Sequence, residues 1–169
     1  MKTRDKILQI FRENRLGLHQ NIMREMIAVV KSTPSDATLV AISQYFSGDT
    51  ALKWAFQFPE DRNLMRDRIN NSWEALAWVK KWPEDREIMR PLINNSWDVL
   101  AWVKKWPEDR EIMRHWINHS ETALAWARHI HEDRKVMRHL INRFENAIEW
   151  VHEWPQDREY FIAKGLLWK

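Results

Sequence analysis

The sequence contains no cysteine, and of its 169 residues only three are glycine and six are proline. The absence of cysteine excludes disulfides, thiolate metal sites and thiol nucleophiles. No apolar run is longer than the five residues at 26–30, whereas a membrane-spanning helix needs about 20 apolar residues. The start of the chain, residues 1–15, is charged throughout and lacks the apolar core of a signal peptide. We therefore expect a cytoplasmic protein that has no membrane partner.

The scarcity of glycine and proline, together with abundant Leu, Ala, Lys, Arg and Glu, favours helices over a sheet. Twelve residues are tryptophan, and five of them recur at intervals of 24 residues: Trp54, Trp78, Trp102, Trp126 and Trp150. Residues 69–93 and 93–117 differ at only four positions. Such a period is typical of stacked helical repeats. The sequence predicts an all-α fold, an α-solenoid of stacked antiparallel helix pairs with a 24-residue repeat.

Each repeat is predicted to hold two short helices. In one copy the first helix begins at Pro83, because proline suits the first helical position, and its apolar stripe includes Ile88. Ser96 is the expected cap of the second helix, which stops before the next proline. Pro91 falls inside the first helix, where we expect a kink. The recurring tryptophans are expected at the edges of the core, filling the gaps between repeats.

The positive charge is concentrated at the N-terminus. Residues 1–31 hold seven Lys and Arg against three Asp and Glu, which leaves 20 and 21 of the totals of 27 and 24 for the rest. We expect an N-terminal helical cap with a basic arm at 1–34 and a repeat array at 35–169. Its units lie near 35–58, 59–82, 83–106, 107–130 and 131–154, followed by a capping helix at 155–169.

The segment LAWVKKWPEDREIM, at residues 76–89 and again at 100–113, carries the register Ala-Leu-x-x-Ala/Val followed by Asp-x-Glu-Val/Ile. This register resembles an uncharacterised family of tandem helical repeats in bacterial and large-virus proteins, over residues 50–160. The tryptophans and the Pro-Glu-Asp-Arg turn depart from that pattern. The resemblance implies an α-helical repeat array, and it implies neither an activity nor catalytic residues.

An arginine stripe is the first candidate for binding. Its members recur at i and i+4 on one flank of each first helix: Arg62, Arg66, Arg86, Arg90, Arg110, Arg114, Arg134 and Arg138. Stacking would turn them into a ladder that grips phosphates or an acidic protein face. Aspartates recur with equal fidelity one residue before each pair, as at Asp85. Because the repeats carry no surplus of positive charge, we favour a lattice in which each aspartate caps its helix and pairs with an arginine of the adjacent repeat.

Two other sets are weaker candidates. Trp73 and Trp97 lie at helix starts, on an angle that points away from the core, so they are candidates for exposed binding residues. His115 and His119 share a helical face and His139 is the equivalent of His115 in the next repeat, a spacing that suits a metal. No carboxylate accompanies them at metalloprotease spacing, so we predict neither a metal site nor a cofactor.

The repeats also bear on function. An active site is a single asymmetric cluster, whereas the carboxylates here recur in every repeat, so we expect no enzyme. The sequence favours a protein-binding adaptor or inhibitor, present as a monomer or a weak homo-oligomer. The alternative is a nucleic-acid-binding solenoid that uses the arginine stripe and a basic arm. The arm consists of Lys2, Arg4, Lys6, Arg12 and Arg15.

Overall fold

The computed structural model describes residues 3–34 and 37–168 of the chain. All regular elements within these ranges are helical, which confirms the predicted all-α fold of helical repeats. The chain divides into two compact units, Met1–Leu92 and Ile93–Lys169. Among the described residues, no helix combines the length and the apolarity that crossing a membrane requires.

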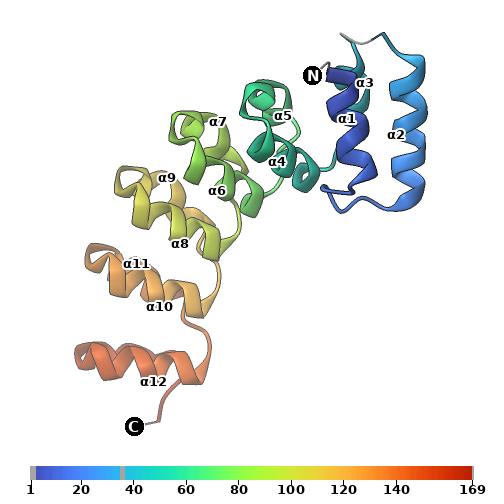
Figure 1. Ribbon diagram of the computed structural model, residues 1–169. Helices are drawn as coiled ribbons and strands as arrows, with labels where there is room; N and C mark the ends of the chain where they lie inside the picture. Colours follow the sequence, from blue (N-terminus) through green and yellow to red (C-terminus); the bar gives the residue numbers. More distant parts are fainter. Residues whose placement is uncertain (1–2, 35–36, 169) are drawn as a thin grey trace. The chain divides into compact units, whose positions relative to one another are not determined.

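The first unit opens with three helices that pack against one another: α1 (Thr3–Arg12), α2 (Gln20–Ser32) and α3 (Thr38–Ser43). Two helical hairpins follow, each with a long α-helix, a 3-10 turn and a short α-helix (Figure 1). One hairpin consists of α4 (Gly48–Gln57), η1 (Pro59–Asp61) and α5 (Arg62–Arg66). The other consists of α6 (Ser72–Lys81), η2 (Pro83–Asp85), α7 (Arg86–Met89) and η3 (Arg90–Leu92).

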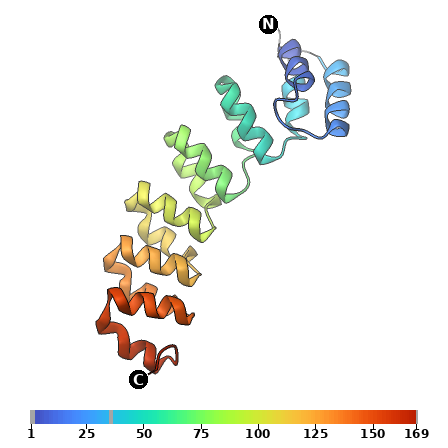
Figure 2. The same cartoon turned by 60° about the horizontal axis from the view of Figure 1, so that its bottom comes forward.

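The second unit contains three hairpins stacked in chain order, with their long helices side by side (Figure 2). The first consists of α8 (Ser96–Lys105), η4 (Pro107–Asp109), α9 (Arg110–Met113) and η5 (Arg114–Trp116). The second consists of α10 (Ser120–His129), η6 (His131–Asp133), α11 (Arg134–Met137) and η7 (Arg138–Leu140). The last consists of α12 (Phe144–Glu153), η8 (Pro155–Asp157) and α13 (Arg158–Ala163).

The packed pair is a long helix and the short helix that follows it, as in α8 with α9 and α10 with α11. The Pro-Glu-Asp segment is therefore the turn inside a hairpin, whereas the units expected from the sequence begin at that segment. A three-residue 3-10 turn is too short to carry the chain away from the long helix, so the helices on either side of the turn become antiparallel neighbours.

Asparagine side chains cap two of the long helices. The Oδ1 atom of Asn71 accepts a hydrogen bond from the amide of Glu74 at 3.0 Å, and that of Asn95 accepts one from the amide of Trp97 at 3.0 Å. The prediction that Ser96 is the cap is wrong, because Ser96 is the first residue inside α8. Asparagine and serine are equally good caps, so the preference scale alone did not distinguish them.

The serine has a different role, which is to close its hairpin. Its hydroxyl accepts a hydrogen bond from the amide of Asn118 at 3.2 Å, just beyond the short helix. In the first unit, Gly48 stands where Ser96 stands, and the Oε2 atom of Glu74 accepts from the corresponding amide of Asn70 at 3.5 Å. A Cβ atom at Gly48 would lie 1.8 Å from that Oε2 atom. Glycine therefore makes room for a carboxylate that replaces the missing hydroxyl.

The short helices α7, α9 and α11 end after one turn and continue as a 3-10 turn. The helix α7 ends at Met89, and η3 contains Pro91. The same change occurs at η5 and η7, which contain no proline. The α-helix does break at Pro91, where we expected a kink, but proline is not the cause, because the α8–α9 and α10–α11 hairpins break at the same place without it. Proline is tolerated because the helix has already changed its hydrogen-bonding pattern.

The recurring tryptophans lie at the centre of the core and not at its edges. All five have an exposed fraction of 0%: Trp54, Trp78, Trp102, Trp126 and Trp150. The predicted apolar stripe is only partly confirmed, because Met89 is buried and Ile88 is 52% exposed. Ile112 and Val136, the equivalents of Ile88 in the second unit, are also about half exposed. A single helical turn can bury only one face, and Met89 occupies it.

Candidate functional site

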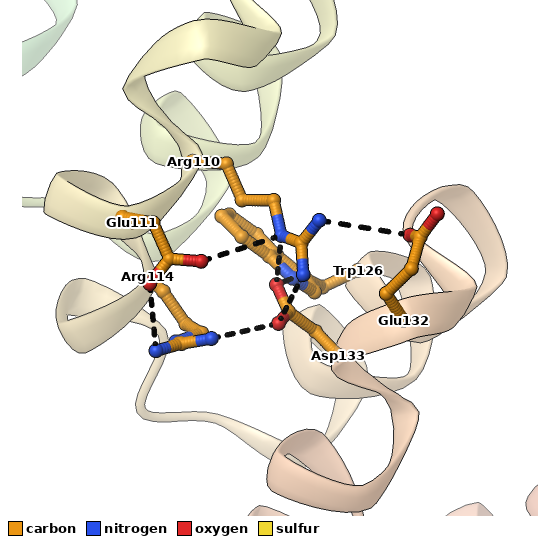
Figure 3. Close-up of polar contacts among 6 residues, drawn as sticks. All are labelled: Arg110, Glu111, Arg114, Trp126, Glu132 and Asp133. Carbon is orange, nitrogen blue, oxygen red and sulfur yellow. Dashed lines mark hydrogen bonds and ion pairs between the residues drawn. The ribbon is translucent and has the colours of Figure 1, made fainter.

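A buried aspartate joins two neighbouring hairpins of the second unit (Figure 3). Asp133 closes the turn η6, and its side chain is 1% exposed. Arg110, on the preceding hairpin, donates to its two oxygens from Nε and Nη2, both at 2.9 Å. Arg114 donates from Nη1 at 2.8 Å. Asp133 is therefore held by a bidentate guanidinium and by a second arginine one turn further along, which is a strong and directional arrangement.

Two further aspartates make the corresponding ion pairs. Arg62 and Arg66 pair with Asp85, and Arg134 and Arg138 pair with Asp157. These contacts confirm the predicted pairing between adjacent repeats for six of the eight candidate arginines. Of the other two, Arg86 begins α7 half-buried, and Arg90, the first residue of η3, pairs with Glu87 of α7 at 2.8 Å.

The second part of that prediction, that each aspartate caps its helix, is wrong. None of the five aspartates that recur with the repeat makes a capping hydrogen bond to a helix amide. Each instead accepts a hydrogen bond from the indole nitrogen of the tryptophan seven residues earlier. The Nε1–Oδ2 distances are 2.8 Å for Trp54–Asp61, 2.7 Å for Trp78–Asp85, 2.7 Å for Trp102–Asp109, 2.8 Å for Trp126–Asp133 and 2.9 Å for Trp150–Asp157.

The sequence analysis missed this hydrogen bond although both partners recur in register. Seven residues along an unbroken helix is two turns, about 10.5 Å, which is too far for a direct contact. The 3-10 turn between the two residues reverses the chain and brings them together. We name the repeated set of one tryptophan, one aspartate and two arginines the Trp–Asp–Arg ladder.

Electrostatics favours the ionised form of Asp133. Burial raises the pKa of Asp133, but hydrogen bonds from Arg110, Trp126 and Arg114 outweigh it and leave this pKa below its ordinary value. The hydrogen bond to Asp133 also raises the pKa of Arg110, against the opposing effect of burial. The ion pair is therefore structural and stays charged at neutral pH, which makes Asp133 a poor general acid or base.

The N-terminal basic arm contributes to the ladder at one residue. Lys6, on α1, lies 2.6 Å from Glu60 and 3.5 Å from Asp61, the first ladder aspartate. Its ammonium also lies 3.6 Å from the centre of the Phe58 ring. Lys6 therefore takes the place that arginines occupy in the other repeats, so that α1 covers the end of the array.

The rest of the arm is divided. Arg12 and Arg15 are exposed, and Arg15 pairs with Glu13. Lys2 and the side chain of Arg4 lie outside the described residues.

A groove of about 430 Å³ lies between the short helices of two hairpins in the second unit. Its apolar walls come from Ile117 on one hairpin and from Val136, Met137 and Leu140 on the next. Polar side chains complete the lining: Glu111, Arg114, His115 and His139. Val136 remains 47% exposed. The groove therefore offers apolar surface to a partner beside groups that can donate and accept hydrogen bonds.

The histidine candidates do not form a metal site. His115 and His139 both line the groove, whereas His119 does not. The Nδ1 atom of His139 lies 2.9 Å from the hydroxyl of Tyr160, so a hydrogen bond already occupies it. Within residues 3–34 and 37–168, no group of three or more His, Cys, Asp and Glu could hold a metal ion.

Neither of the two candidate tryptophans lines the groove. Trp73 on α6 is 49% exposed and Trp97 on α8 is 56% exposed, which confirms the prediction that these two side chains face solvent.

A second cavity, of about 320 Å³, lies in the second unit beside Arg110 and Glu132 and is also lined by His129 and Ile130. Of the charged groups in this second cavity, Arg110 belongs to the ladder and Glu132 lies 3.7 Å from Arg110.

Comparisons with family models, with curated proteins and with solved structures found no match to this chain. The resemblance of the repeat register to an uncharacterised helical-repeat family therefore stays a prediction.

Proposed function

We propose that this chain is a non-enzymatic protein that binds another protein through the groove of its second unit. The observation that carries the proposal is the half-exposed Val136 at a groove with apolar walls, beside a ladder whose charged groups bind one another. Exposed apolar side chains around a concave site are typical of surfaces that receive a partner's side chain. The expected occupant is an apolar side chain of the partner.

The ladder argues against catalysis. Its carboxylates are buried and hydrogen-bonded by arginine and tryptophan, and the same set recurs in successive repeats. An active site needs one cleft with polar groups that are free to react. A set that recurs with each hairpin supports a structural role, in which the repeats extend a surface.

The nucleic-acid alternative has less support. Such a protein would present a surplus of positive charge on its binding elements. Here Lys6 and most of the arginine stripe meet carboxylates of neighbouring repeats, as at Asp61 and Asp133. We therefore propose a protein partner, and a chain that is a monomer or a weak homo-oligomer.

The test is affinity capture from nuclease-treated lysate, with wild-type protein and two variants compared by quantitative mass spectrometry. Val136→Ser removes apolar surface at the groove. Ile148→Ser is the matched control, because Ile148 is 48% exposed and lies on α12, outside the groove lining. We expect a protein partner that wild type and Ile148→Ser both retain and that Val136→Ser loses by about tenfold, which corresponds to about 1.4 kcal/mol.

Equal capture by all three proteins would contradict the proposal. A partner that wild type captures from untreated lysate but not from nuclease-treated lysate would also contradict it. Sedimentation of the purified chain checks the oligomeric state in the same preparation.

A further inference from the structure

Each set of one tryptophan, one aspartate and two arginines is one step of the ladder. The last step, at Asp157, has fewer carboxylates around its arginines than the step before it, at Asp133. Arg138 donates to Asp157 at 2.6 Å, and the Nε atom of Arg134 lies 3.5 Å from the same side chain. The Nε atoms of both arginines are buried and make no hydrogen bond to any described residue. One carboxylate therefore faces two guanidinium groups.

The preceding step has two more carboxylates. There Arg110 and Arg114 share Asp133, while Glu132 lies 3.7 Å from Arg110 and Glu111 lies 3.0 Å from Arg114. Three acids therefore surround two arginines, and Figure 3 shows all five side chains together.

The difference comes from two positions of the repeat. Gln156, in the last hairpin, stands where the α10–α11 hairpin has Glu132. Lys135, in the α10–α11 hairpin, stands where the α8–α9 hairpin has Glu111. Both are exposed. Residues 134–143 consequently contain four Lys and Arg and neither Asp nor Glu. The nearby Glu159 makes no ion pair with Arg134 or Arg138 among the described residues.

Arg134, Lys135 and Arg138 form a cationic surface that adjoins the groove. Lys135 directly precedes Val136 on α11, and the same helix and its 3-10 turn supply Met137 and Leu140 to the apolar walls. Arg138 is held in place by Tyr160, whose ring centre lies 4.1 Å from the guanidinium carbon. An ordered guanidinium loses less side-chain entropy when it binds a carboxylate.

We infer that the groove and the cationic surface of α11 and η7 together bind an acidic segment of a partner protein that also carries an apolar side chain. The apolar side chain occupies the space between Ile117 and Val136. Carboxylates of the segment meet Arg134, Lys135 and Arg138, where the preceding step has its own glutamates. This inference rests on the proposed function and specifies the chemistry of the partner.

The experiment measures fluorescence anisotropy of short labelled peptides with the full chain. One peptide contains Asp, Glu and Leu; a second has Asn and Gln in place of the acids; a third has Ser in place of Leu. We expect the first to bind at least about tenfold more tightly than either of the others, because each lacks one of the two contacts.

Lys135→Glu combined with Gln156→Glu installs the residues of the preceding repeat, so the fold should be kept, which circular dichroism checks. We expect the acidic peptide to lose at least about tenfold in affinity with this variant. Lys104→Glu, on the exposed surface of α8, is the control of equal charge change to Lys135→Glu and should bind as wild type does.

Three results would overturn the inference: no preference of wild type for the acidic peptide, undiminished binding by the Lys135→Glu, Gln156→Glu variant, or tighter binding of oligo(dT) that the same variant loses. The last result would assign this surface to phosphates. If the peptides fail while capture still depends on Val136, the protein-binding function stands and only the acidic chemistry is rejected.

Discussion

The indole nitrogen of Trp126 donates a 2.8 Å hydrogen bond to the Oδ2 atom of Asp133, the carboxylate that also receives Arg110 and Arg114. The tryptophan belongs to the same hairpin as the aspartate, and the arginines belong to the preceding one. A single buried charge therefore ties the inside of one hairpin to its neighbour. Because a buried charge is costly unless it is paired, folding of a hairpin and stacking of two hairpins depend on the same side chain.

The substitution Asp133→Asn removes the negative charge of this side chain but keeps an acceptor for the hydrogen bond from Trp126. The amide oxygen can still accept from Trp126, but Arg110 and Arg114 lose their counter-charge. We expect the free energy of unfolding, measured in urea, to fall by about 3 kcal/mol, the low end for breaking a buried pair because the arginines remain partly exposed. Glu145→Gln, an exposed carboxylate on α12, should change it by less than about 0.5 kcal/mol. A small effect at Asp133 equal to that control would contradict a structural role for the ladder.

Acid should weaken the ladder through Asp133. Its pKa lies below the ordinary value of 3.8, so the folded state binds this proton less readily than the unfolded state does. The resulting stability is present above the unfolded pKa and is lost as pH falls through the lower folded pKa. We expect the difference in unfolding free energy between wild type and Asp133→Asn to narrow as pH drops below about 4. A difference that stays constant in acid would show that the charge is not responsible.

Trp126→Phe tests the hydrogen bond from the other side. The phenyl ring keeps most of the apolar packing, but Asp133 loses one of its donors and a small cavity remains. We expect a loss of about 1–3 kcal/mol in unfolding free energy. Trp97→Phe, at a side chain 56% exposed, should cost less than about 0.5 kcal/mol. Similar losses for the two variants would mean that burial of the tryptophans matters less than the structure indicates.

Gly48 and Glu74 should behave as a coupled pair. Gly48→Ser places a Cβ atom against the carboxylate of Glu74, which is 3% exposed and has little room to move. We expect a loss of about 1–3 kcal/mol from overpacking. Adding Glu74→Thr reproduces the combination of Ser96 with Thr122 in the second unit, so the double variant should recover at least about 1 kcal/mol relative to Gly48→Ser. Additive losses in thermal unfolding would show that the two positions are independent.

The sequence was sufficient for much of the fold. Because helical repeats use local contacts, the 24-residue interval between Trp102 and Trp126 and the scarcity of glycine predicted the all-α architecture. The exposure of Trp97 followed from its angle on the helix. The ion pair of Arg110 with Asp133 followed from two residue types that recur in register without surplus charge.

Other features could not be read from helical periodicity. The contact of Trp126 with Asp133 depends on a 3-10 turn that reverses the chain, and the role of Ser96 depends on which helix end lies opposite it. The groove required two successive hairpins to be placed side by side before Ile117 and Val136 could share it. The shortage of carboxylates around Arg134 became visible only when the partners of each arginine were known.

Apolar spacing and helix propensity act over a few neighbouring residues, so the order of the amino acids alone predicts a protein built from repeated amphipathic helices. Which charged groups pair between repeats, and which remain for a partner, depends instead on how the hairpins pack. Ion pairing between repeats requires distances of a few ångströms between residues some twenty positions apart, as for Arg114 and Asp133, and hairpin stacking sets those distances.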